Sequence, residues 1–307
     1  MSLEEVMNSR GAERFAKIAE FLKTRPNPAS IEPTITEQLA FEVSRIHRAG
    51  VNSPSYNLFT PEIMRTMLSM CAYNIAALQG ESAPNYHVLA SLNEAAGKLS
   101  VRLARPQQNW TIKQTEYRQA FQYFENAAKY YKITENTKQR AFTHKFKADA
   151  FFEFAEWLKS PEKRREIYAR ASASHLKSAE LFRKEAHPIT AAEYSYAGKS
   201  EYIVAKLSHY RPKKEQEQAA RKAALYALQA LRFNKEDLHK PHLTFDVAKS
   251  SDALQQITRE EGHRDRTKRY YEKAADFFRK EANSQNIIAQ CERRISELSA
   301  STLQAHP

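Results

Sequence analysis

The sequence predicts an all-α protein, a right-handed α-solenoid built from long antiparallel helix hairpins. Only six glycines occur in 307 residues, and the chain lacks β-branched runs bounded by the Asn-Gly or Asp-Gly turns that mark strand hairpins. The pentapeptide FRKEA stands in HLKSAELFRKEAHP and again 96 residues later in RYYEKAADFFRKEANS. Both copies lie in a longer pattern of a small residue, an aromatic residue and a polar break. They therefore indicate a repeated structural unit.

Residues 1–110 are expected to form a helical cap with irregular connections. The clearest helix follows TPEI, where Thr60 is the expected N-cap and Pro61 has the fixed backbone angle of a first helical residue. Gly80 is expected to end this helix, and Gly50 an earlier one. The proline-containing stretches RPNPASIEPT and VNSPSYN are expected to be linkers.

The rest of the chain, residues 111–307, is expected to be the repeat domain. Its apolar residues recur at helical spacing, with small and aromatic residues alternating on one face. Aligning the small residue that precedes each aromatic one gives equivalent positions at 128, 179, 224 and 275, which are 51, 45 and 51 residues apart. Each step can hold one helix hairpin, and hairpins stack because one pair cannot bury its own apolar face. The equivalent aromatic residues expected to be buried between hairpins are Tyr131, Phe182 and Phe278.

Two segments of the repeat region resemble a known family. YYEKAADFFRKEANSQNIIAQCERRISEL and FENAAKYYKITENTKQRAFTHKFKADAFFEFAEWL are similar to the tetratricopeptide-type (TPR-like) hairpins of the soluble attachment protein (SNAP) family. The resemblance covers about residues 115–300, with steps longer than the usual tetratricopeptide period of about 34 residues. It implies a non-enzymatic adaptor that grips bundled helices in membrane trafficking. The chain departs from the family in being basic and in ending with ELSASTLQAHP, which lacks an acidic ATPase-engaging tail.

The formal charge of +12 is concentrated in the repeat region, because residues 1–110 have a net charge of +1 and the remainder +11. Such a field attracts an acidic protein, a nucleic acid or an anionic membrane surface. The basic clusters are KRR at 163–165, RPKK at 211–214, RDRTKR at 264–269 and Arg293–Arg294. Acidic residues alternate with them, so pairing within helices can neutralise much of the charge. Nucleic-acid binding therefore remains an alternative to protein binding.

In the repeats that the chain resembles, the helix before each aromatic-rich helix lines the concave side. The resemblance therefore places the binding surface on the helices at approximately 138–158, 190–208, 243–261 and 284–298. If their polar residues project into one groove, the groove is basic with aromatic anchors, which suits an acidic or helical protein partner. The candidate partner-binding residues are Lys145, Tyr194, Lys199, Tyr202, Lys206, Lys249 and Arg293.

Common motifs of enzymes and cofactor sites are missing from the sequence. The closest two glycines are 17 residues apart, which excludes both the dinucleotide fingerprint GxGxxG and the P-loop. In DLHKPH, His239 and His242 lie near Asp237 and Asp246, but the proline between the histidines breaks any helix that would align them. No metal, cofactor or enzymatic activity is expected, and a helical enzyme with an unusual site is the remaining alternative.

The sequence predicts a cytoplasmic protein without a membrane span. MSLEEVMNSR has no apolar run behind it, and the most apolar window, MLSMCAYNIAAL, is shorter than the roughly 20 residues that a bilayer crossing needs. Cys71 and Cys291 both lie in apolar helical patterns and are expected to be buried thiols, which fits a reducing compartment.

Overall fold

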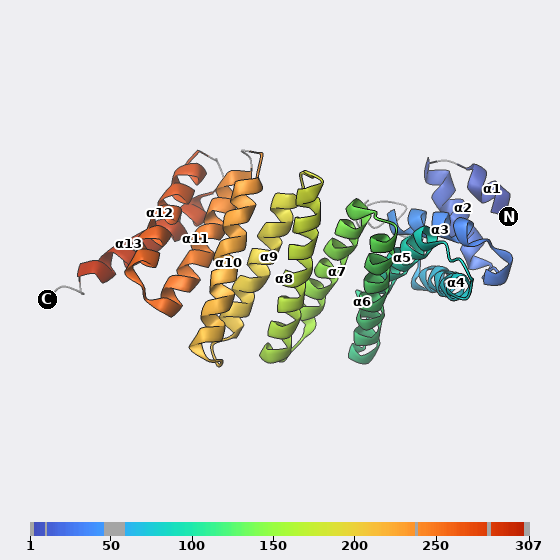
Figure 1. The fold of residues 1–307 in the computed structure, drawn as a ribbon, viewed down its shortest axis with the longest axis horizontal. Helices are drawn as coiled ribbons and strands as arrows, with labels where there is room; N and C mark the ends of the chain where they lie inside the picture. The colour runs from blue at the N-terminus through green and yellow to red at the C-terminus, as the bar shows by residue number, and fades with distance from the viewer. Residues whose placement is uncertain (1–2, 10, 46–58, 237–238, 281–283, 304–307) are drawn as a thin grey trace. The chain divides into compact units, whose positions relative to one another are not determined.

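The computed structural model confirms that the chain is an all-α protein with a TPR-like helical repeat (Figure 1). The structure describes residues 3–9, 11–45, 59–236, 239–280 and 284–303. Thirteen α-helices, one 3-10 helix and no strand are present among these residues. Gly50 and the VNSPSYN linker lie outside the described residues, so the expectations for them stay predictions.

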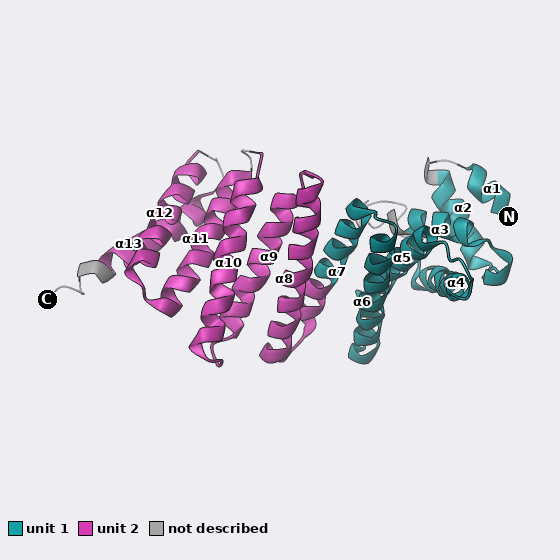
Figure 2. Cartoon of the chain, in the orientation of Figure 1, with its two compact units in different colours: residues 1–150 teal, residues 151–307 magenta. Residues whose placement is uncertain are grey.

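The chain forms two compact units, residues 1–150 and residues 151–307 (Figure 2). The boundary falls within α7 (Thr137–Trp157), whereas the expected division into cap and repeat domain at residue 110 stays a prediction. The other helices of the first unit are α1 (Leu3–Asn8), α2 (Gly11–Lys23), η1 (Pro28–Ser30), α3 (Pro33–Arg45), α4 (Pro61–Gln79), α5 (Tyr86–Ala104) and α6 (Trp110–Ile133). Those of the second unit are α8 (Pro161–Lys184), α9 (Thr190–Leu207), α10 (Lys213–Phe233), α11 (Lys240–Thr258), α12 (Glu261–Phe278) and α13 (Gln285–Leu303).

Helix starts follow the capping signals in the sequence. The Thr60 hydroxyl accepts a hydrogen bond from the Ile63 N–H at 3.5 Å at the start of α4, and Ser160 accepts one from Lys163 at 3.3 Å at the start of α8. In both helices a proline follows the cap, where its missing N–H needs no intrahelical partner. The RPNPASIEPT stretch departs from a simple linker, because it contains the short 3-10 helix η1.

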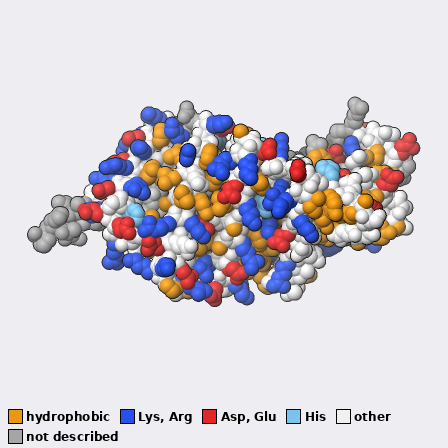
Figure 3. Space-filling model, viewed as in Figure 1, with side chains coloured by type: hydrophobic (Ala, Val, Ile, Leu, Met, Phe, Trp, Pro, Cys, Tyr) orange, Lys and Arg blue, Asp and Glu red, His pale blue; other side chains and the backbone are white. Residues whose placement is uncertain are grey.

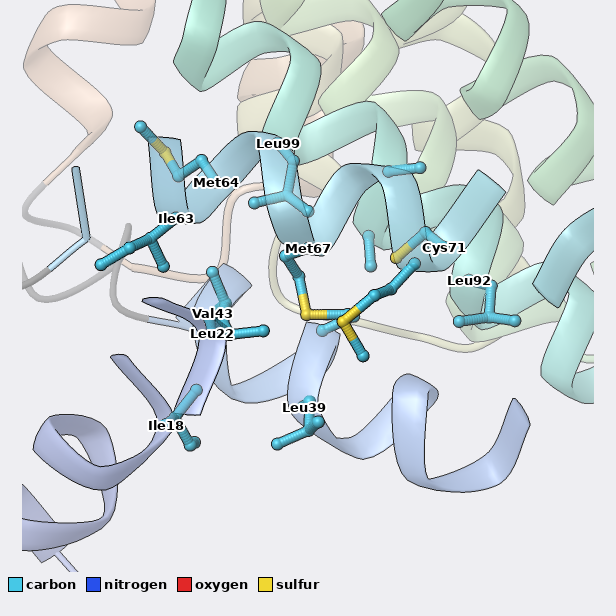
Figure 4. Packing of buried hydrophobic residues seen from close by; sticks show 14 of the residues in the cluster. Ile18, Leu22, Leu39, Val43, Ile63, Met64, Met67, Cys71, Leu92 and Leu99 are labelled. Carbon is cyan, nitrogen blue, oxygen red and sulfur yellow. The ribbon is translucent and has the colours of Figure 1, made fainter. Parts of the chain in front are cut away.

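The first unit has a core of buried aliphatic and sulfur-containing side chains. Figure 4 shows Met67 and Cys71 of α4 among leucine, isoleucine and valine side chains from several helices. Burial raises the pKa of the Cys71 thiol to about 12 and that of Cys291 to about 11. Both cysteines are buried free thiols, as the sequence predicts.

The second unit is a stack of antiparallel helices in which each helix packs on the next along the chain, from α8 to α13 (Figure 1). In addition, α9 packs directly against α11. The helices α7, α9, α11 and α13 occupy the four stretches expected to carry the binding surface. Helix α11 begins earlier than expected, at Lys240, because Pro241 is accommodated in its first turn.

The repeat alignment is confirmed by burial. The alanines at the four equivalent positions are all buried, and Tyr131, Phe182 and Phe278 have exposed fractions of 3%, 0% and 0%. In the remaining repeat, the position equivalent to these aromatics is Ala227, which is also buried. A small residue followed by a large one thus fills the space between hairpins in three of the four repeats.

A close approach of α9 and α10 depends on Gly198. A Cβ atom at this position would lie 3.2 Å from the Ala223 carbonyl oxygen and 3.2 Å from the Ala227 backbone nitrogen. Because backbone atoms cannot move aside as a side chain can, we expect Gly198→Ala to lower the free energy of unfolding by about 1–3 kcal/mol. Urea denaturation followed by circular dichroism measures this change.

Gly262→Ala is the matched control, because a Cβ there meets no atom within 4 Å. Since alanine favours helix formation over glycine, this variant should be as stable as the wild type or slightly more stable. Equal stabilities of the two variants would show that α9 and α10 are not as closely packed as described.

Candidate protein-binding site

One side of α9 carries an aromatic residue and two lysines in a single exposed stripe. Tyr196, Lys199 and Lys206 are exposed, and the residues between them are buried or half-buried. Their spacings of three and seven residues place them on the same face of the helix. Tyr196 exposes 44% of its surface and is therefore accessible to a partner.

Tyr202 lies at the centre of a cluster of rings and lysines that joins α9 to α11. The ammonium group of Lys206 is 4.7 Å from the Tyr202 ring centroid, and that of Lys249 on α11 is 5.4 Å from the same centroid. Lys249 also lies 5.4 Å from the Phe245 ring. The negative faces of the rings attract these ammonium groups. We call Tyr202, Lys206, Phe245 and Lys249 the Tyr202 cluster.

Asp246 connects the two helices beside this cluster. Its carboxylate accepts a hydrogen bond from the Ser195 hydroxyl at 3.3 Å and lies 3.6 Å from the Lys199 ammonium group. The charge of Lys199 is therefore partly neutralised. Lys206 and Lys249, by contrast, form no ion pair within the described ranges.

A pocket of about 480 Å³ opens next to Asp246. Residues from α9, the end of α10, α11 and the turns before α9 and α11 line it, and Ile189, Phe233 and Leu243 form the apolar part of its wall. Lys199 and Tyr196 also line the pocket, so it is continuous with the exposed stripe of α9. We call this pocket, the stripe, Asp246 and the Tyr202 cluster together the α9/α11 face.

The structure brings four of the seven candidate residues to this face: Lys199, Tyr202, Lys206 and Lys249. Tyr194 is not among them, because its side chain is only 2% exposed and its ring stacks on Phe233 at 5.5 Å. The expectation that Tyr194 projects into a groove is therefore wrong. Tyr196 takes that place, since a shift of two residues turns a side chain by about 200° around the helix. Its spacing to Lys199 and Lys206 was the signal available in the sequence.

The other two candidates have separate surroundings. Lys145 belongs to the first unit, where it donates a hydrogen bond to Asp149 at 2.7 Å. Arg293 lies on α13, with its Nε atom 3.9 Å from a Glu297 carboxylate oxygen. The α9/α11 face as defined here includes neither residue, so their part in binding stays a prediction.

Much of the basic character of the second unit is neutralised by ion pairs. Lys and Arg side chains are interspersed with Asp and Glu over its visible face (Figure 3). Some of the pairs connect successive repeats: Arg165 lies 3.4 Å from Glu215, and Arg211 lies 2.6 Å from Glu162. Pairing between repeats adds to the expected pairing within helices. Both kinds weaken the case for a continuous phosphate-binding surface.

The DLHKPH segment does not assemble a metal site in the described part of the chain. His239 lies 3.2 Å from Glu236, whereas the His242 ring packs edge-on against Phe278 at 5.1 Å. Asp237 lies outside the described residues. No group of three or more His, Cys, Asp or Glu residues suited to a metal ion occurs among the described ones.

No helix in the described ranges has the length and apolar character needed to span a bilayer. No protein-family model matches the chain, and no curated protein matches it. Several solved structures match the chain at low sequence identity. BtubC (BKLC) from P. vanneervenii has 15% sequence identity and a TM-score of 0.42, with 97% of this chain and 95% of that chain covered.

A circular tandem repeat protein with a novel repeat topology has 10% identity and a TM-score of 0.42, covering 96% of this chain and 78% of that chain. The apo form of RapI has 12% identity and a TM-score of 0.37, covering 88% and 85%.

Proposed function

We propose that the protein is a non-enzymatic scaffold or adaptor that binds another protein on its α9/α11 face. The Tyr202 cluster carries this proposal. In it, lysines from two adjacent hairpins flank one tyrosine ring beside a partly apolar pocket. Aromatic side chains provide contact area at protein interfaces, and uncompensated lysines select a partner of opposite charge.

The charge of the face defines the chemistry of the partner. The face carries four lysines, Lys199, Lys206, Lys235 and Lys249, and two carboxylates, Asp246 and Glu236, which leaves an excess of positive charge. An acidic helix with an apolar side chain for the pocket fits this arrangement, because a helix presents such anchors at spacings of three and four residues.

The resemblance of the hairpins to attachment proteins favours a partner built from helices and a role in membrane trafficking. It also agrees with a cytoplasmic location, which the two buried free thiols support. Peripheral contact with an anionic membrane would use the same excess of positive charge.

Charge reversal at Lys206 and Lys249 tests the proposed face. A partner is first identified by affinity purification and mass spectrometry, and its dissociation constant is then measured for the wild type and for Lys206→Glu/Lys249→Glu. We expect at least about tenfold weaker binding, because like charges then oppose each other at the interface. Higher salt should slow association with the wild type.

Lys213→Glu/Lys214→Glu is the matched control, because it reverses the same charge in the same unit at two exposed residues that begin α10. Negative charge at a helix start is favourable, so this variant should remain folded and should bind the partner nearly as the wild type does. Equal weakening in both variants would show that net charge, and not the α9/α11 face, determines binding. Binding of nucleic acid in place of protein would favour the alternative function.

A further inference from the structure

The first unit contains a polar pocket that has no part in the proposed protein-binding function. Its volume is about 610 Å³, and residues from α2, α3, α5, α6 and α7 line it. Among the described lining residues, the carboxylates Glu37, Glu42 and Glu94 outnumber the cations Arg14 and Lys98. Several ionisable side chains thus converge on one cavity, which is typical of a ligand site.

One side of the pocket is held in place by Glu94. Its two carboxylate oxygens accept hydrogen bonds from Lys98 at 2.5 Å and from the Thr143 hydroxyl at 2.8 Å. Lys98 also lies over the Phe146 ring, 4.0 Å from its centroid. The charges of Glu94 and Lys98 therefore neutralise each other, and their hydrogen bonds hold both side chains in place on this side of the pocket.

The second cation is also paired, but more loosely. Arg14 Nη1 lies 3.9 Å from Glu42 Oε1, and its Nε atom is buried without a hydrogen-bond partner among the described residues. A buried guanidinium N–H without an acceptor is costly, so Arg14 lowers the stability of this side of the pocket.

Glu37 is the remaining carboxylate. Within the part of the chain that the structure describes, it forms no ion pair, and it lies one helical turn before Phe41 on α3. Phe41 exposes 57% of its surface at the pocket. A carboxylate and an aromatic ring on the same helix face are the two groups that commonly bind an organic cation.

The carboxylates and cations that line the pocket leave an excess of one negative charge. Burial raises the pKa of the Tyr131 hydroxyl, and the negative charges of Glu94 and Glu37 raise it further. Tyr131 therefore stays protonated, with its hydroxyl 3.4 Å from that of Ser91. The excess of negative charge favours a positively charged ligand.

We propose that this pocket binds an organic cation, a primary ammonium or a guanidinium group, with the Glu37 carboxylate as counter-ion and the Phe41 ring as the flanking surface. The cation is either a free small amine or a lysine or arginine side chain of a partner. In both cases the same two residues recognise it.

Isothermal titration calorimetry on the full chain tests this site with defined probes. Cadaverine and agmatine represent free cations, N-acetyl-lysine and N-acetyl-arginine methylamides represent protein side chains, and 1-pentanol is the neutral analogue. We expect saturable binding of at least one cation and none of the alcohol at the same concentration. Glu37→Gln should weaken binding by about tenfold or more, because a charge-assisted hydrogen bond is lost.

Glu81→Gln is the control, because Glu81 is exposed in the first unit and does not line the pocket. It should leave affinity unchanged. Phe41→Ala, at an exposed position, should weaken binding severalfold without affecting the fold. Binding of only the N-acetyl methylamides of lysine and arginine would identify a partner side chain as the ligand. Binding of cadaverine or agmatine would identify a small amine. No binding of any cation, equal binding of pentanol, or unchanged affinity of Glu37→Gln would overturn the proposal.

Discussion

Replacing Phe278 with alanine should lower the free energy of unfolding by about 3–5 kcal/mol. The Phe278 side chain is 0% exposed and belongs to a cluster that includes Ala248, Cys291 and Leu298. The Phe245 ring meets it edge-on at 6.2 Å. The substitution removes buried apolar surface from the interface at which α11, α12 and α13 pack together. It also leaves a cavity, because three packed helices cannot close on a missing ring without moving their backbones.

Phe277→Ala is the matched control for this prediction. Phe277 is the preceding residue and is only half-buried, with Lys240 5.8 Å from its ring. Truncation of Phe277 therefore removes fewer contacts. Phe277→Ala should lower the free energy of unfolding clearly less than Phe278→Ala does. Chemical denaturation monitored by circular dichroism compares the two variants under identical conditions. Equal losses would mean that the repeat alignment, which assigns Phe278 to the joint between hairpins, is incorrect.

Breaking the His175–Glu193 pair should destabilise the second unit by about 3–5 kcal/mol. His175 Nδ1 lies 2.9 Å from Glu193 Oε2, and their side chains are 1% and 0% exposed. The other carboxylate oxygen of Glu193 has no hydrogen-bond partner among the described residues. His175→Leu therefore removes the hydrogen-bond partner of a carboxylate that is out of reach of water.

The double variant His175→Leu/Glu193→Leu separates the pair from its two members. Because it replaces both polar groups with apolar ones, it should recover much of the stability lost in His175→Leu alone. The single variants His175→Leu and Glu193→Leu and the double variant form a thermodynamic cycle. The deviation of their changes in unfolding free energy from additivity measures the interaction between the two side chains. Additive losses, measured by denaturation in the same buffer, would show that the contact between the two side chains contributes no coupling.

The spacing of residues along α9 was not enough to predict which of its side chains are exposed. Helix α9 contacts α8, α10 and α11, so most of its circumference is buried. In such a helix an apolar stripe no longer identifies the single buried side. Tyr194 and Tyr196 both fit the local sequence pattern, and only the positions of the neighbouring helices bury the first and expose the second.

The pocket in the first unit could not be found from the sequence for a related reason. Arg14, Glu37, Glu94, Tyr131 and Gln139 are far apart along the chain and form no motif at any fixed spacing. Long-range packing of helices brings them to one cavity. Ion pairs such as Arg211 with Glu162 likewise join residues one repeat apart. A search for oppositely charged residues three or four positions apart in one helix does not find them.

The sequence by itself determined the all-α class, the helix start at Thr60, and the burial of Phe182 and Phe278 at equivalent positions of the repeat. These features depend on local backbone chemistry and on periodic burial, which a linear pattern records. Only the tertiary structure decided that Tyr196 is exposed on α9, that the Tyr202 cluster joins α9 to α11, and that acidic residues meet in the first unit. Each of these depends on which helices become neighbours, because burial and electrostatic pairing are properties of distances in space and not of positions along the chain.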